Sequence, residues 1–236
     1  VGGAATGALT APKAYYTRVR EICDAHGVLL ILDEVMSGAG RTGRFLAAEH
    51  WDVRPDLVAL AKGLAAGYFP FGACLTSTRL LEAVEGGGGF NHGHTYSASP
   101  LACAVGRAVL AEHLERDLYG NALRMGALLK SRLQALAADF PFIGEVKGEG
   151  LLLGFDVVAD AETGAPLPPA LNAHLAICEA ARKRGLIIYS RRMFDGLRGD
   201  QFLVSPPLIV TEADIEEIAG LLREALEEFR PLAERA

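Results

Sequence analysis

The sequence predicts an α/β protein with a doubly wound, mixed or parallel sheet, followed by a smaller α+β domain. The unbroken apolar run at residues 28–32 has the length of a buried strand, and a second such run follows at residues 55–61. A helical pattern at residues 12–26 precedes the first run, and this alternation is typical of βαβ units. After Pro141 the residues alternate between apolar and polar, which predicts a sheet with one exposed face.

Glycine and proline mark the ends of the other elements in the first part of the chain. Gly27 is expected to end the first helix, because glycine readily adopts the left-handed conformation found after helices. Residues 72–76 form a weaker third strand pattern. Ser99-Pro100 is typical of a helix start, so a long helix is expected there, with another at residues 119–138.

The last part of the chain has the pattern of a separate small domain. We expect a helix at residues 172–184, strands at 186–189 and 201–205, and a final helix at 211–229. Because the pattern changes near residue 140, we predict two domains, 1–138 and 139–236. The first would be part of a larger ligand-binding domain with long connecting helices, and the second the α+β domain.

Composition excludes several classes of protein. The 236 residues carry a net charge of −6 without a block of lysine or arginine, which argues against nucleic acid or an acidic membrane surface as a partner. No apolar run approaches the about 20 residues needed to cross a bilayer. The four cysteines show no CxxC spacing, so we expect reduced thiols and a cytoplasmic protein. The chain starts at Val1, and we expect that the N-terminal part of a longer protein precedes it.

Two acids, Asp33 and Glu34, directly follow the first predicted strand. In doubly wound sheets, ligands bind beyond the carboxyl ends of the strands. The acids could instead cap the following loop or pair with Arg41 or Arg44. A magnesium site of a nucleotide hydrolase would also fit, but it requires a GxxxxGK[ST] loop, which these residues do not contain.

A lysine, Lys62, follows the second predicted strand. Such a lysine often extends its amine into solvent, but burial would favour the neutral, nucleophilic amine that forms Schiff bases. Pyridoxal phosphate (PLP) chemistry needs a lysine that holds the cofactor aldehyde and a carboxylate that keeps the pyridine nitrogen protonated. Lys62 and Asp33 together therefore predict a PLP site.

Three motifs then connect the chain with a known family. They are "LLILDEVMSGAGRTGRF", "PDLVALAKGLAAGYFPFGA" and "NHGHTYSASPLACAVG", and 29 positions separate Asp33 from Lys62. In order and spacing they resemble the class III aminotransferases, which are fold-type-I (aspartate aminotransferase-like) PLP-dependent transferases. The resemblance extends over essentially the whole chain and implies that the first domain is a partial large domain.

The resemblance also implies the role of individual residues. Lys62 would form the Schiff base and move the proton during transfer, and Asp33 would pair with the pyridine nitrogen. Val35 would pack against the cofactor ring. Thr95 would bind the cofactor phosphate of the neighbouring subunit, assisted by backbone groups around His94 and Tyr96. A homodimer with a shared active site is implied.

Arg191 and Arg192 lie close to where related enzymes place an arginine for the substrate carboxylate. Guanidinium groups suit this task because they bind carboxylates in a bidentate manner. The alternative is a pair of solvated arginines on a loop. His92 and His94 could bind a metal, but no third ligand stands at ordinary spacing, so we expect no metal site.

The predicted function is transfer of an amino group between an amine or ω-amino acid and a 2-oxo acid through Lys62. Two alternatives stay open. A PLP-dependent aminomutase, decarboxylase or racemase could use the same fold, because the pocket selects which bond is broken. The chain could also be a non-catalytic, truncated fragment.

Overall fold

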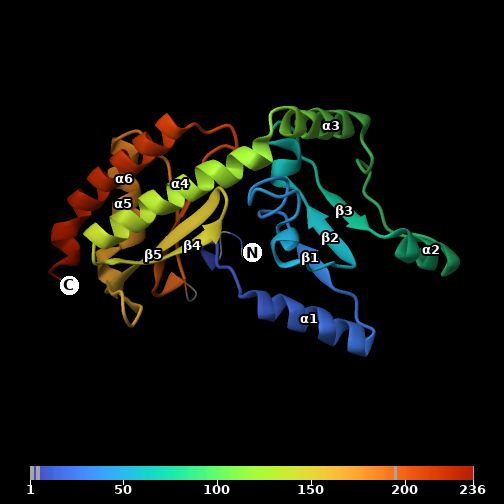
Figure 1. Ribbon diagram of the computed structural model, residues 1–236, viewed down its shortest axis with the longest axis horizontal. Coiled ribbons are helices and arrows are strands. Elements are labelled where there is room, and N and C mark those ends of the chain that lie inside the picture. The colour runs from blue at the N-terminus through green and yellow to red at the C-terminus, as the bar shows by residue number, and fades with distance from the viewer. Residues whose placement is uncertain (1–2, 4–5, 194–195, 236) are drawn as a thin grey trace. The chain divides into compact units, whose positions relative to one another are not determined.

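The computed structural model describes residues 3, 6–193 and 196–235, and it divides the chain into two compact units. The first unit is Ala11–Tyr119, and the second is Gly120–Ala236 together with Val1–Thr10. This division differs from the predicted one, because helix α4 (Leu118–Asp139) contributes to the core of the second unit. The elements are labelled in Figure 1.

A three-stranded mixed sheet forms the centre of the first unit. Its strands are β1 (Ile31–Asp33), β2 (Leu57–Leu60) and β3 (Ala73–Thr76), in the order β1-β2-β3. β1 and β2 are parallel, with Asp33 opposite Ala59, and β3 is antiparallel to β2. Only a 3-10 helix, η2 (Ala47–Trp51), lies between β1 and β2, so this crossover lacks the α-helix of an ordinary βαβ unit.

Three α-helices belong to the first unit (Figure 1): α1 (Lys13–His26), α2 (Thr78–Gly86) and α3 (Pro100–Glu115). Gly27 ends α1 with a φ of 64°, as the sequence predicts. α2 was not expected. Its start is capped by Ser77, whose Oγ accepts a hydrogen bond from the Leu80 amide at 3.4 Å.

Strand β1 begins three residues later than its apolar run, because the preceding backbone groups have other partners. The Val28 amide donates to the Cys23 carbonyl at 2.9 Å and so completes the end of α1. The Leu30 amide donates to the Asp56 carboxylate at 2.9 Å. The ladder with β2 therefore starts only after these contacts.

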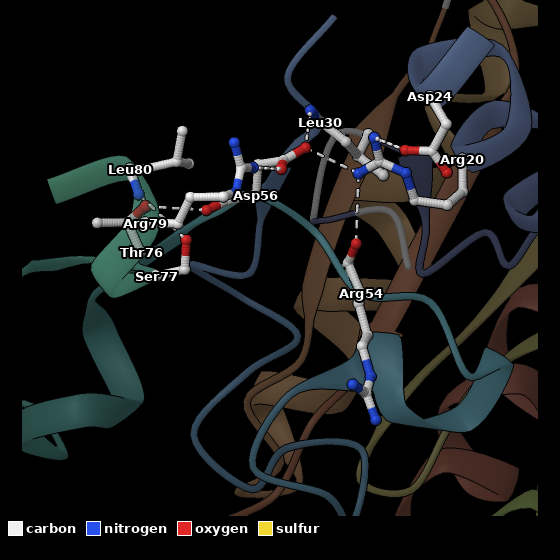
Figure 2. Close-up of polar contacts among 9 residues, drawn as sticks. All are labelled: Arg20, Asp24, Leu30, Arg54, Asp56, Thr76, Ser77, Arg79 and Leu80. Atoms are coloured by element: carbon white, nitrogen blue, oxygen red, sulfur yellow. Dashed lines mark hydrogen bonds and ion pairs between the residues drawn. The ribbon is translucent and has the colours of Figure 1, made fainter. Parts of the chain in front are cut away.

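Asp56 joins several elements at the amino end of β2 (Figure 2). Its Oδ2 accepts hydrogen bonds from Arg20 of α1 at 2.8 Å and from the Leu30 amide, and its Oδ1 accepts one from Arg79 of α2 at 3.3 Å. Thr76 donates its hydroxyl to the Asp56 carbonyl at 3.0 Å. The Leu30 amide and the Arg20 guanidinium hold the pKa of Asp56 below its ordinary value.

Replacing Asp56 by Asn should lower the free energy of unfolding of the first unit by about 2 kcal/mol, because Arg20 and the Leu30 amide lose a charged acceptor. The folded pKa lies below the unfolded value of about 3.9, so the contribution is complete above about pH 4 and is lost as the pH falls through the folded pKa. The difference between wild type and D56N should therefore shrink below about pH 4. Urea unfolding followed by Trp51 fluorescence measures both effects.

The matched control is Asp52→Asn, the same substitution at an exposed residue nearby. We expect it to change the free energy of unfolding by less than about 0.5 kcal/mol. Equal losses in the two variants would contradict the role given to Asp56.

The second unit is an antiparallel sheet covered by helices (Figure 1). Its strands lie in the order β4 (Ile143–Glu149), β5 (Leu152–Asp160), β8 (Asp200–Val204) and β7 (Tyr189–Arg192), and the short β6 (Ala165–Pro166) pairs with β5. Its helices are α4, α5 (Ala173–Lys183) and α6 (Glu212–Ala233). No helix within residues 3, 6–193 and 196–235 is both long and apolar enough to cross a membrane.

The core of the second unit lies between this sheet and the three helices. Phe155 of β5 and Phe202 of β8 are fully buried and stack with their ring centroids 5.0 Å apart. Leu129 and Leu133 of α4 and Leu222 of α6 belong to the same buried cluster. Burial of each such side chain stabilises the fold by about 1.5–3 kcal/mol, which explains why α4 belongs to this unit.

Candidate functional site

Asp33 and Lys62 lie at the same end of the first unit's sheet. Asp33 is the last residue of β1, and Lys62 follows β2 after one further residue, Ala61. Because β1 and β2 are parallel neighbours, both side chains start from the carboxyl edge of the sheet. The structure thus brings together the two residues that the sequence singles out.

The backbone of Lys62 has an uncommon conformation. Its φ is 45°, in the left-handed region that side chains other than glycine rarely adopt, and it opens the 3-10 turn η3 (Lys62–Ala65). Such a conformation costs on the order of 1–3 kcal/mol and occurs preferentially at functional sites. The Lys62 side chain is exposed. The expected burial of Lys62 is therefore not seen in this chain.

The Asp33 carboxylate keeps one oxygen available. Its Oδ1 accepts a hydrogen bond from the Val35 amide at 2.9 Å. Its Oδ2 has no partner within the described part of the chain, and the Asp33 side chain is exposed. Val35 is half-buried on the loop that follows. The local backbone thus orients Asp33 while leaving it able to accept another hydrogen bond.

Glu34 has a different role from its neighbour, since it is only 3% exposed and its carboxylate is fully used by the following loop. Its Oε2 accepts hydrogen bonds from the Ser37 hydroxyl at 2.5 Å and the Ala47 amide at 3.0 Å, and its Oε1 accepts one from the Ala48 amide at 2.8 Å. An acidic side chain is favourable at the helix start of η2. Glu34 therefore holds residues 35–48 as a closed loop.

The closed loop also packs tightly against the end of β2. A Cβ on Gly38 would lie 2.6 Å from Leu60 Cδ2, and a Cβ on Gly63 would lie 3.3 Å from Ala39 Cβ. Glycine is needed at position 38 because a Cβ would also lie 2.8 Å from the backbone carbonyl oxygen of Glu34, which cannot move aside as a side chain can. Within the loop, burial lowers the pKa of Arg41 to about 10. These contacts fix the backbone on both sides of Lys62.

Replacing Glu34 by Gln should destabilise the first unit by about 2 kcal/mol, because an amide group would face backbone donors where a carboxylate oxygen now accepts. The loop should open more often, so trypsin should cut after Arg41 or Arg44 at least several-fold faster. Limited digestion followed by mass analysis measures the rate. Glu82→Gln on α2, an exposed residue, is the control; if both variants are cut at the wild-type rate, Glu34 does not hold the loop.

Thr95 lies in an exposed segment between α2 and α3. Its side chain is exposed, as are the neighbouring Phe90 (76%) and Tyr96 (87%). The His94 amide donates to the Ser97 hydroxyl at 3.1 Å, so this backbone group already has a partner. The Thr95 hydroxyl has no hydrogen-bond partner within the described part of the chain.

Arg191 and Arg192 lie on strand β7 and not on a loop. They differ sharply in exposure and in side-chain contacts. Arg192 is 12% exposed and forms a bidentate pair with Asp200, with Nε at 2.8 Å from Oδ1 and Nη2 at 3.2 Å from Oδ2. This hydrogen bonding raises the pKa of Arg192. Arg191 is exposed and has no partner among the residues described. Arg192 is thus occupied by a structural contact.

Sequence reasoning missed Asp56 and Asp200, the two acids that organise the surrounding strands. Asp56 directly precedes an apolar run, and this position could have marked it as the residue that fixes the start of the strand. Asp200 gave no such signal, because its partner Arg192 is a cross-strand neighbour.

The groups at the edge of the sheet suit PLP chemically. A primary amine on Lys62 can bind an aldehyde carbon, the unpartnered oxygen of Asp33 can accept a pyridinium N–H, and Val35 offers an apolar surface for a ring. The same groups do not suit a metal ion. In the described part of the chain, no three His, Cys, Asp or Glu side chains are grouped so as to hold an ion.

Comparison with known proteins gives consistent matches. The family model for aminotransferase class-III matches residues 2–226. The uncharacterized aminotransferase YodT of Bacillus subtilis (strain 168) is 42% identical over 95% of this chain and 51% of its own length. An amine transaminase structure from an uncultivated Pseudomonas species, in its PLP-bound form, is 40% identical, has a TM-score of 0.87, and is matched over 95% of this chain and 50% of its own.

The structure of taurine:2-oxoglutarate aminotransferase from Bifidobacterium kashiwanohense, in complex with PLP and glutamate, has a TM-score of 0.88 at 31% identity. The match covers 98% of this chain and 50% of that one. The chain thus spans about half the length of the relatives that it matches. These structures confirm the predicted fold class. The chain belongs to the class III aminotransferase family.

Proposed function

We propose that the protein is a PLP-dependent aminotransferase that moves an amino group between an amine or ω-amino acid and a 2-oxo acid. The observation that carries the proposal is the placement of Asp33 and Lys62 at the carboxyl ends of two neighbouring parallel strands in a chain of this family. In the overall reaction the donor loses its amino group and becomes a carbonyl compound, while the 2-oxo acid gains that group and becomes an amino acid.

Each residue of the site would have one task. When bound, PLP supplies a ring that withdraws electrons from the carbon bearing the amino group. The Lys62 amine would hold the cofactor and afterwards carry a proton at its Nζ. The Asp33 carboxylate, oriented by the Val35 amide, would accept a hydrogen bond from the ring nitrogen and stabilise its positive charge. Val35 would pack against the ring.

A homodimer with a shared site is part of the proposal. The exposed segment around Thr95, with Phe90 and Tyr96 largely in solvent, supports a partner that covers it. Thr95 would then bind the cofactor phosphate of that partner. The four cysteines are all free thiols, which supports a cytoplasmic location.

Arg191 is the candidate for the substrate carboxylate. It is exposed and unpartnered within the described ranges, whereas the guanidinium of Arg192 is taken by Asp200. A planar guanidinium can bind a carboxylate with two parallel hydrogen bonds.

The test is an amino-transfer assay on the native full-length protein with PLP, a panel of amines and ω-amino acids, and pyruvate or 2-oxoglutarate as acceptor. Formation of alanine or glutamate at a rate that depends on the amine is the expected result. Consumption of the amino substrate without formation of alanine or glutamate from the added oxo acid would instead indicate a decarboxylase, racemase or aminomutase, and would overturn the proposal.

A further inference from the structure

The left-handed backbone of Lys62 needs support from the surrounding fold, because a residue with a Cβ keeps such a conformation only where its neighbours enforce it. Within the turn η3, the Leu64 amide donates to the Ala61 carbonyl at 3.0 Å. This bond closes the turn, but a closed turn can still shift as a whole relative to the sheet. The contacts that fix its position must therefore come from outside the turn.

Leu64 attaches the turn to the sheet. Its side chain is 5% exposed and belongs to a small buried cluster with Ala39 of the closed loop and with Val58 and Leu60 of β2. Burial of this leucine keeps the turn against the sheet. The contact is made through a side chain that can change its rotamer, so it does not by itself define where the backbone lies.

Gly63 lies directly against the backbone of the closed loop. A Cβ on Gly63 would lie 3.3 Å from Ala39 Cβ, which is closer than the separation of about 3.5–4.0 Å that carbon atoms prefer. The carbonyl oxygens of Ala39 and Gly38 would lie 3.7 and 4.0 Å from it, and these are ordinary contact distances. Among these neighbours, the Ala39 methyl thus limits how closely the turn approaches the loop.

Ala39 is held firmly in its place. It is 1% exposed, and its amide donates to the Phe45 carbonyl at 2.8 Å. Its own φ is 51°, so the loop keeps a second residue other than glycine in the left-handed conformation. The buried Glu34 carboxylate holds the loop closed. Ala39 therefore offers a fixed surface to the turn that begins with Lys62.

We propose that the closed loop is a positioning element for Lys62, in which the contact between Ala39 and Gly63 sets the place of the Lys62 amine. This inference rests on the proposed function, which gives Lys62 its task. Ala39 and Gly63 act through the backbone of Lys62 and carry no reacting group. A small displacement of the turn should therefore slow amino transfer while PLP stays attached to Lys62.

The test moves one methyl group across this contact in the native full-length protein. Gly63→Ala adds a methyl that presses the turn away from the loop, and it should lower kcat about tenfold. Ala39→Gly removes the opposite methyl, and glycine suits the left-handed φ, so kcat should stay within about threefold. The double variant again has one methyl at the contact, and its kcat should return to within about threefold of the wild type.

A second measurement needs no turnover. Hydrogen–deuterium exchange without added PLP or substrate, followed by mass analysis of the peptide covering residues 61–68, reports how often the turn opens. Exchange should be about tenfold faster in Gly63→Ala and close to wild type in the double variant. Ala66→Gly is the control, because it replaces another left-handed alanine, with a φ of 48°, whose side chain is exposed. It should leave kcat and exchange within about twofold.

The outcomes distinguish this proposal from two others. If Gly63→Ala is slow and adding Ala39→Gly does not restore the rate, position 63 lacks a side chain for another reason, such as close approach of the cofactor, and the positioning role is overturned. A Gly63→Ala variant with wild-type rate and exchange overturns it as well. If Gly63→Ala alone does not fold, the proposal still requires the double variant to fold and to transfer amino groups.

None of these results would change the task of Lys62. A cofactor adduct on a different lysine would instead overturn the proposed function, and the exchange of residues 61–68 would still show whether the contact between Ala39 and Gly63 holds the turn.

Discussion

Replacing Lys62 by Arg is expected to lower the rate of amino transfer by the native full-length protein by at least about 10³-fold, because the variant loses both the nucleophilic amine and the group that carries the proton. Arginine keeps the positive charge and a side chain of similar length, so the loss would report on the chemistry of the amine and not on charge. The rate of alanine formation from pyruvate measures it.

A second measurement identifies the amine directly. Borohydride reduction of the PLP-bound wild type, followed by peptide mass analysis, should place the cofactor on the peptide that contains Lys62, and the variant should carry no adduct. Lys13→Arg, at the start of α1, is the control and should keep both rate and adduct. A cofactor adduct on any other lysine, or none in the wild type, would refute the assignment.

Replacing Asp33 by Asn should lower the rate by on the order of 10²–10³-fold while leaving the covalent attachment of PLP to Lys62 intact. The amide can still accept the hydrogen bond from the Val35 amide, which the Asp33 carboxylate accepts at 2.9 Å, so the local backbone should not change. What it cannot supply is the negative charge that keeps a ring nitrogen protonated. The rate and the borohydride adduct are measured on the same sample.

Asp52→Asn serves as the control for Asp33→Asn, because Asp52 is also exposed and asparagine tolerates its left-handed φ of 55°. It should transfer amino groups at the wild-type rate. A D33N variant that does the same would show that Asp33 does not act on the cofactor, and the proposed division of tasks between Asp33 and Glu34 would fail with it.

Asp33, the last residue of β1, and Glu34, which follows it, were predicted to different extents from the sequence. The apolar run and the spacing to Lys62 placed Asp33 at the carboxyl edge of the sheet, and the structure has it there. Glu34 holds the loop through hydrogen bonds from the Ala47 and Ala48 amides, which lie 13 and 14 residues further along the chain. No local pattern reports such contacts, since they exist only after the loop has folded back.

For Arg191 and Arg192, the sequence did not predict which of the two would be buried in a contact. Their position near a substrate site came from the resemblance alone. The sequence did not predict on which face of a strand each arginine lies. Strand β7 begins at Tyr189, later than the predicted strand, and so includes both of them. The register with β8 then separated them, because Asp200 lies opposite Arg192. Long-range pairing of this kind has no signature in the residues of β7.

The family, the fold class and the candidate residues Asp33, Lys62 and Thr95 could be predicted from local properties of the chain, namely short motifs at fixed spacing and apolar periodicity. The exposure and strain of Lys62, the loop closed by Glu34 and the contact between Asp200 and Arg192 became evident only in the folded chain. Burial, register and ion pairing join residues far apart in sequence, so they are decided only once the chain has packed.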